Sequence, residues 1–366
     1  MKTIDDKIQI YKERDYPVKK ANEIIQRAKL DLNLTEQKIF LYAVSKIKPD
    51  DKALQTYEFS INDFCDVCGI ARNDGRTIEN IKEYIRGLKA KPFWMINEDR
   101  DWETIDWIAK AWVTPKSGKI KIRFDETMHR YLINMLGNFT QFSLLGVLPM
   151  RSTYSIRLYE LLRSYAGLHK KIFEIDELKA LLMAPYVNFK DFRRKVLEIA
   201  EREINAYTDI EITWEPIAKG RKVVQVEFTI ELLDSWGKLQ NANIANGVLD
   251  GQMELQMDGS IIEINLSKPK KVQRIKAKPQ QKNEVQHEDS EFDETTTEAI
   301  QELERPQNYK VKDESLELKN SKPVRTTDDV DVSYDERILN YMKALSNTLG
   351  KEQFEKLMKA LESADK

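Results

Sequence analysis

The chain has 366 residues, and its 41% hydrophobic content can bury a substantial core divided among two or three domains. Charged residues make up 33%, yet the formal net charge is −2, so net charge alone does not indicate a nucleic-acid partner. The chain lacks an apolar run near the roughly 20 residues of a membrane helix, and its first residues lack the apolar core of a signal peptide. Two cysteines suit a reducing compartment, so we expect a cytoplasmic protein that does not bind membranes.

The first half of the chain shows the element order of a winged helix. We expect this domain to span residues 15–145, with elements in the order helix, strand, helix, helix and hairpin. The apolar spacing predicts these elements at 35–48, 59–64, 76–89, 107–113 and 119–124.

The same order returns in residues 146–236. The motif Phe59-Ser-Ile61-Asn-Asp63-Phe64 is echoed 114 residues later by Phe173-Glu-Ile175-Asp-Glu177-Leu178. The second set of elements is predicted at 153–166, 173–178, 189–205, 210–216 and 222–230. Two copies in one order, joined by a shared motif, predict an α+β protein with two tandem winged helices.

Basic residues gather at the start of the long helix of the second copy. Asn188 is a good N-cap, and Lys190, Arg193, Arg194 and Lys195 crowd the first two turns, where Asp191 is the one acid. Helix N-termini attract phosphates, and in a helix-turn-helix this end enters the major groove. For an isolated cluster a solvated helix face is the simpler interpretation, but its place in a winged helix favours DNA binding.

A second, weaker basic cluster lies at the predicted turn of the last hairpin. It consists of Lys219, Arg221 and Lys222, which suit contacts with the DNA backbone or the minor groove. Hairpin turns are often basic for solubility alone, so this cluster by itself decides nothing.

The sequence offers little support for a metal site or an enzyme. Cys65 and Cys68 form a single C-x-x-C, whereas a structural zinc site needs four ligands, so we predict two buried thiols and no metal. Motifs for phosphate-binding loops, dinucleotide binding and nucleophile elbows are missing, and no two histidines lie closer than 40 residues. We therefore predict no catalytic residues and no cofactor.

The composition changes near Trp236. Lys268 to Lys282 carries seven basic residues and no acidic one, and Glu284 to Glu336 carries 17 acidic against 6 basic. We predict a mostly disordered charged linker over 237–332, interrupted by a weak hairpin at 253–266, and a small helical hairpin over 333–364.

Several motifs, in order, resemble the initiator (Rep) family of theta-replicating, iteron-bearing plasmids. They are Leu34-Thr-Glu-Gln-Lys-Ile-Phe40, Phe139-Thr-Gln-Phe-Ser-Leu-Leu145, Tyr154-Ser-Ile-Arg-Leu-Tyr-Glu-Leu-Leu-Arg-Ser-Tyr165, Phe173-Glu-Ile-Asp-Glu-Leu178, Phe189-Lys-Asp-Phe-Arg-Arg-Lys-Val-Leu197, Glu203-Ile-Asn205 and Ile212-Thr-Trp-Glu-Pro216. The resemblance covers roughly residues 15–236, and the tail beyond Trp236 matches nothing.

The resemblance implies different roles for the two domains. Residues 15–145 would dimerise, with DNA contact also open to them, and residues 146–236 would read the repeated double-stranded DNA sites called iterons. A homodimer in equilibrium with the monomer would repress its own promoter, while the monomer would open the origin and recruit host replication proteins, such as an initiator or a helicase. The resemblance also places Ser152 and Arg157 at the start of a helix near the phosphates.

Two other classes of protein remain open. A transcriptional regulator could use the same winged helices, but it would normally need one DNA-reading domain and a ligand or dimer domain. A structural or partner-binding protein would leave the ordered motifs unexplained. Two tandem winged helices therefore favour the initiator.

Overall fold

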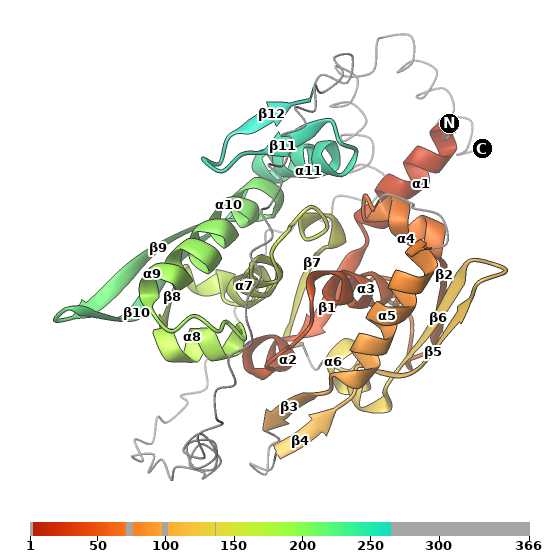
Figure 1. Cartoon of the computed structure of the whole chain (residues 1–366), viewed down its shortest axis with the longest axis horizontal. Coiled ribbons are helices and arrows are strands. Elements are labelled where there is room, and N and C mark those ends of the chain that lie inside the picture. The colour runs from red at the N-terminus through yellow and green to blue at the C-terminus, as the bar shows by residue number, and fades with distance from the viewer. Residues whose placement is uncertain (1–2, 71–75, 97–101, 136, 265–366) are drawn as a thin grey trace, which may run out of the picture. The chain divides into compact units, whose positions relative to one another are not determined.

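The computed structural model describes residues 3–70, 76–96, 102–135 and 137–264 (Figure 1). The helical hairpin predicted at 333–364, and the predicted linker from 265 onward, lie outside these residues. None of the helices in the described ranges is long and apolar enough to cross a membrane.

The first winged helix forms around a three-stranded sheet in the order β2-β6-β5. Its elements are α3 (Leu34–Val44), β2 (Thr56–Ser60), α4 (Ile61–Val67), α5 (Arg76–Ala90), β5 (Ile108–Thr114) and β6 (Lys119–Phe124). Between α5 and β5 lies a separate antiparallel pair, β3 (Phe93–Ile96) and β4 (Trp102–Ile105). Edge-to-face contacts of Phe40 with Trp107 and Phe124, at 4.6 and 6.0 Å, join α3 to the sheet.

The second winged helix has the same strand order, β8-β10-β9. Its elements are α7 (Thr153–Arg163), β8 (Lys170–Glu174), α8 (Ile175–Leu181), α9 (Phe189–Phe192), a π-helical turn (Arg193–Leu197), α10 (Glu198–Tyr207), β9 (Ile210–Lys219) and β10 (Lys222–Leu232). The apolar residues of the repeated motif are buried in both copies: Phe59, Ile61 and Phe64, and Phe173, Ile175 and Leu178. The predicted α+β fold with two tandem winged helices is confirmed.

A two-stranded ribbon and a buried charge cluster join the two winged helices. Strand β1 (Pro17–Ala21) pairs antiparallel with β7 (Phe139–Ser143), and α2 (Asn22–Arg27) follows β1 and contacts α7. The Nζ atom of Lys20 lies 2.7 Å from Oε1 of Glu160, and both side chains are buried. A buried ion pair of this kind requires both partners, because either one alone would be an uncompensated charge.

The remaining short elements complete the two domains. They are α1 (Ile4–Arg14), α6 (His129–Leu132) and the 3-10 turns Glu126–Met128, Leu144–Gly146 and Ala166–Leu168.

The structure corrects the predicted end of the folded region. Residues 237–264 are ordered into α11 (Ser235–Leu249) and an antiparallel pair of β11 (Met253–Leu255) with β12 (Ile261–Glu263). The prediction of a hairpin at 253–266 is confirmed, whereas the prediction of disorder from residue 237 is wrong for this part. The physical reason is that the strong charge blocks begin later, and α11 buries Ala245 and the amide side chains of Asn241 and Asn246.

Candidate nucleic-acid interface

The second winged helix presents a helix-turn-helix formed by α8 and α9. Asn188 caps α9, because its Oδ1 accepts a hydrogen bond of 2.8 Å from the backbone N–H of Asp191. The predicted N-cap is therefore confirmed.

The sequence predicted one continuous helix over residues 189–205, but in the structure this helix is interrupted. The π-helical turn at Arg193–Leu197 inserts one extra residue between α9 and α10, which rotates the buried face. Leu197 is consequently buried, while Phe189 and Ile199 are half-buried. The turn lies within the basic cluster and sets the direction of its side chains.

All four predicted cations of this helix, Lys190, Arg193, Arg194 and Lys195, are exposed. Asp191 lies among them, 3.4 Å from Arg194 Nη2 and 3.9 Å from Lys195 Nζ. The hydrogen bond from Asn188, followed by these neighbouring cations, lowers the pKa of Asp191. Glu198, which pairs with Arg193, is the second carboxylate here, and two carboxylates do not neutralise four cations, so this part of the helix keeps a net positive charge.

Arg193 differs from Arg194 because two partners hold its side chain in place. Its Nε donates a hydrogen bond of 2.7 Å to Glu198 Oε1, and its guanidinium lies over the ring of Trp214 on β9. Arg194 has one long contact, and 64% of its side chain is exposed. Arg194 is thus the cluster's more accessible arginine.

The predicted wing forms as β9 and β10, which are joined by a tight turn. Lys219 pairs with Lys222 across the turn, and Gly220 adopts a φ of +66°, a conformation that side chains rarely take. Lys219, Arg221 and Lys222 are all exposed, and none is paired with an acidic residue of the described ranges. The wing tip is therefore a second cationic surface.

The structure separates the two residues predicted at the start of α7. Ser152 is half-buried, and its Oγ caps the helix by accepting a hydrogen bond of 3.4 Å from the N–H of Ser155. Arg157 is 3% exposed, which corrects the expectation that it lies near the phosphates. Its Nη2 donates to the carbonyl oxygens of Ile25 and Ala28 at 2.6 and 2.8 Å, since its position on α7 faces α2. Arg157 therefore joins the domains.

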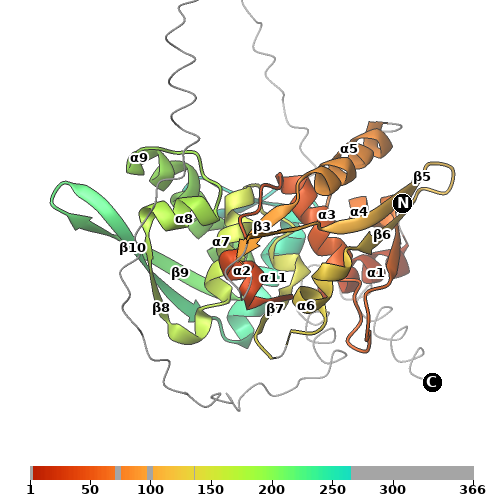
Figure 2. The same cartoon turned by 90° about the horizontal axis from the view of Figure 1, so that it is seen from below.

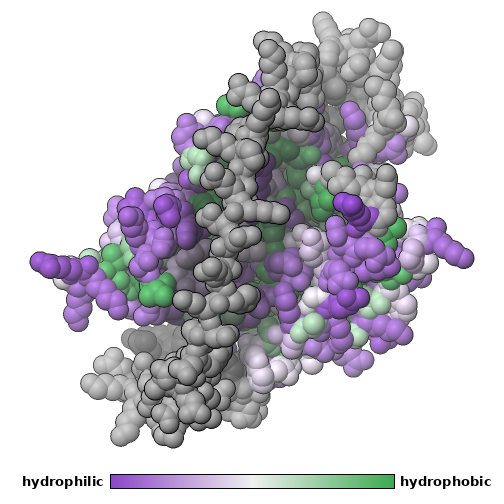
Figure 3. Space-filling model, viewed as in Figure 1, coloured by the Kyte–Doolittle hydropathy of each residue, from purple (hydrophilic) through white to green (hydrophobic). Residues whose placement is uncertain are grey.

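The two helix-turn-helix units face the same side of the molecule. Figure 2 shows α9 and α5 on its upper side, with the β9–β10 wing at one end and the β5–β6 wing at the other. The space-filling view shows hydrophilic surface over both helices (Figure 3).

The corresponding helix of the first winged helix, α5, carries less unpaired positive charge than the cluster of Lys190, Arg193, Arg194 and Lys195. Three of its cations form close ion pairs with nearby acids: Lys82 with Glu79, Arg86 with Glu83, and Lys89 with Asp106, at 2.6 to 3.0 Å. This surface therefore attracts phosphates less than the four cations of the second copy do. The hairpin of β5 and β6 adds Lys119 and Lys121, which share Glu58.

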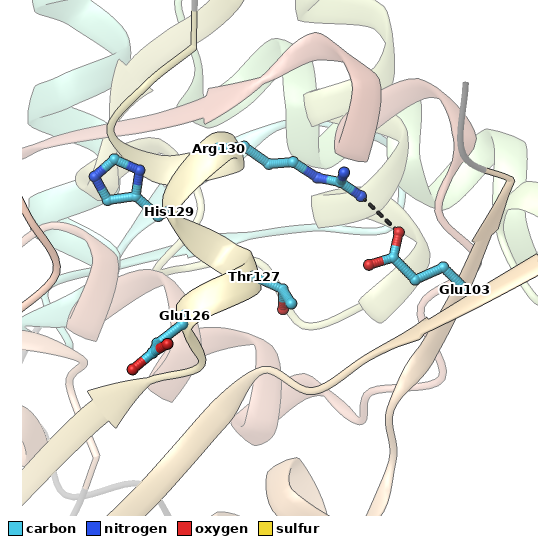
Figure 4. Close-up of a pocket in the computed structure, with 5 residues that line it drawn as sticks. All are labelled: Glu103, Glu126, Thr127, His129 and Arg130. Carbon is cyan, nitrogen blue, oxygen red and sulfur yellow. Dashed lines mark hydrogen bonds and ion pairs between the residues drawn. The ribbon is translucent and has the colours of Figure 1, made fainter. Parts of the chain in front are cut away.

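A surface hollow of about 260 Å³ is lined by Glu103, Glu126, Thr127, His129 and Arg130 (Figure 4). Arg130 Nη2 bonds to Glu103 Oε2 at 2.9 Å, and Glu126 points away from this pair. Within the described ranges, no three metal-ligating side chains are grouped to hold an ion.

The prediction of buried thiols is confirmed. Cys65 and Cys68 are 1% and 4% exposed and unbridged, and burial raises the pKa of Cys68 to about 12. A thiol that stays protonated is a packing residue.

Comparisons with known proteins match both winged helices. Residues 17–163 match the family described as Initiator Replication protein, WH1, and residues 174–230 match Initiator Rep protein, WH2. The chain is similar to the PI protein of Escherichia coli, with 31% identity over 151 residues, 36% of this chain. That match spans about half of the PI protein, 48% of its length.

Two further likenesses agree with this assignment. An uncharacterized 27.6 kDa protein of Escherichia coli is 22% identical over 209 residues, covering 53% of this chain and 86% of that protein. The crystal structure of Pi initiator protein in complex with iteron DNA has a TM-score of 0.51 and 22% identity, covering 61% of this chain and 99% of that one. The latter shows a shared fold. With both domains matched in order, this chain belongs to the family of initiator replication proteins.

Proposed function

We propose that this chain is a plasmid replication initiator that binds repeated double-stranded DNA sites, the iterons, at an origin. The observation that carries the proposal is the exposed basic cluster of α9 and the π-helical turn after it, together with the basic wing tip. Support also comes from the family, and from a solved relative that is described as bound to iteron DNA.

In this proposal the two basic surfaces have different tasks. Helix α9 and the π-helical turn after it enter the major groove, where an arginine can form two hydrogen bonds with guanine, and the lysines hold the backbone. Lys219, Arg221 and Lys222 at the wing contact phosphates, as does Ser152 at the start of α7. Residues 146–236 thus read the iteron, and residues 15–145 dimerise and add DNA contacts.

We further infer the wider role that the resemblance implies. The monomer helps to open the origin and recruits host replication proteins, and a homodimer in equilibrium with it represses the chain's own promoter. The protein acts in the bacterial cytoplasm. The proposal includes no catalytic activity, cofactor or metal ion.

The direct test is replication of a plasmid that carries the repeats adjacent to the coding sequence, with and without this chain. We expect replication only when the chain is supplied, and we expect a variant with Lys190, Arg193, Arg194 and Lys195 all changed to Ala to abolish it. A chain that binds the repeats and represses transcription, but never supports replication, would point to a transcriptional regulator instead.

A further inference from the structure

Two segments that lie outside both family matches contact each other. Helix α1 precedes the first matched range, and α11 follows the second. Figure 1 shows α11 between α10 of the second winged helix and α1, which packs on α4 of the first. These segments provide a second junction between the domains, in addition to the β1–β7 ribbon.

The centre of this junction is Arg14, the last residue of α1, which is 1% exposed. Its Nη1 donates to Asn246 Oδ1 at 2.8 Å and to Asp250 Oδ1 at 3.0 Å, although these partners lie more than 230 residues away. Its Nε and Nη2 donate to the carbonyl oxygens of Val67 and Asp66, at 3.0 and 3.2 Å, at the end of α4. One guanidinium therefore binds α1, α4 and α11 together.

The second oxygen of Asp250 is also occupied. Tyr11 donates its hydroxyl to Asp250 Oδ2 at 2.6 Å, which fixes the carboxylate in its position beside Arg14. Nearby, Gly69 adopts a φ of +64°, and a Cβ atom there would lie 2.9 Å from the carbonyl oxygen of Leu249. The end of α4 and the end of α11 thus approach each other so closely that a side chain at position 69 would clash.

The first half of α11 is attached to the second winged helix. Asn241 is buried, and its Nδ2 donates to the carbonyl oxygens of Asn205 and Thr208, at 2.9 and 2.8 Å, at the end of α10. Ala245, one turn later, is fully buried. The two ends of one helix therefore bind different domains through hydrogen bonds that are buried or partly buried.

We propose that α1 and residues 235–264 form an interdomain clasp that holds the two winged helices in one orientation, with Arg14 and Asn241 as its positioning residues. The clasp keeps both helix-turn-helix units on the same side before DNA arrives. Binding with both units then loses little further orientational freedom, so one chain engages a full site more tightly. This last consequence rests on the proposed function, whereas the clasp itself does not.

The orientation can be measured in the full chain without DNA. Spin labels on cysteines placed at exposed Lys116 and Glu211 report the distance between the two winged helices, while Cys65 and Cys68 are buried. We expect one narrow distance distribution for the otherwise unaltered chain. We expect a broad one for Arg14→Ala and for Asn241→Ala, and no change for the matched control Lys7→Ala on the exposed side of α1.

A second experiment measures the affinity of each protein for a full repeat and for a shortened duplex. The shortened duplex contains only the part of the repeat that footprinting assigns to the second winged helix. Asn241→Ala should weaken binding to the full repeat by about tenfold and leave the shortened duplex unchanged. If Arg14→Ala fails to fold, the distance distribution and the affinities of Asn241→Ala test the clasp. A narrow, unshifted distribution in the folded variants would overturn the clasp, whereas absence of DNA binding in every protein would overturn the proposed function alone.

Discussion

The guanidinium of Arg193 lies over the indole ring of Trp214, with 5.9 Å between Cζ and the ring centroid. Glu198 accepts a hydrogen bond from Arg193, and Glu201 accepts one of 3.0 Å from Trp214 Nε1. The π-helical turn makes this possible, because it brings residues five apart onto one side of the helix. These contacts hold the Arg193 side chain against the wing strand β9.

Arg194 is the arginine that we expect to read a base. Replacing Arg194 by Ala should weaken binding to the cognate repeat by about 1–3 kcal/mol and relax the preference at one base position. Arg193→Ala, the matched control, should weaken cognate and scrambled duplexes by similar factors, because its side chain braces the wing. Binding isotherms on both duplexes measure the difference. An equal loss on both duplexes for Arg194→Ala would make the residue an electrostatic anchor.

The wing lysines should act without regard to sequence. Lys219→Ala or Lys222→Ala should weaken binding to cognate and random DNA alike, since an exposed ammonium binds phosphate as a point charge. Each substitution should also lower the slope of log affinity against log salt by about one. Titrations at several salt concentrations provide the slope. A change confined to the cognate duplex would instead assign these lysines to base contacts.

The sequence predicted the parts of the fold that local patterns encode. Phe59, Ile61 and Phe64 recur as Phe173, Ile175 and Leu178 because the same strand-to-helix turn buries the same three positions. The basic start of α9 was visible for a similar reason, since four cations on consecutive exposed turns need no knowledge of distant segments. Both features depend on neighbours within a few residues.

Features that depend on distant partners were missed. Arg157 lies in a family-like motif, but whether it faces DNA or α2 depends on where α2 packs. Helix α11 likewise binds a distant residue, Arg14, whereas its amide side chains resemble those of a flexible linker. The π-helical turn is a single inserted residue, and apolar spacing alone does not reveal it.

Glu203 provides a test by pH. Burial raises its pKa above the ordinary value of 4.5, although the N–H groups of Arg151 and Ser152 donate to its carboxylate. The folded state therefore holds this proton more tightly than the unfolded chain, so above pH 4.5 the free energy of unfolding falls as pH rises towards the folded pKa.

Glu203→Gln removes that titration. Relative to the unaltered chain, the free energy of unfolding of this variant should increase as pH rises from 4.5 to 7, as measured by urea unfolding at each pH. Glu211→Gln, at an exposed position, is the control and should show a constant difference. A constant difference for Glu203→Gln as well would mean that the carboxyl titrates alike in both states.

The last prediction concerns where the folded core ends. A fragment of residues 1–264 should unfold at the same urea midpoint as the full chain, because it retains every described contact of α11. A fragment of residues 1–236 should be less stable by about 2–4 kcal/mol, since the surface that buries Ala245 and Asn241 becomes exposed. Removal of α11 also exposes Arg14 to water. The decrease in the free energy of unfolding should therefore be smaller than if Arg14 stayed buried without its partners. Both fragments keep α9 and the wing, and a shortened duplex for the second winged helix should bind them equally. Equal midpoints for the two fragments would show that α11 contributes nothing to the core and that its contacts with α1 and α10 are energetically neutral.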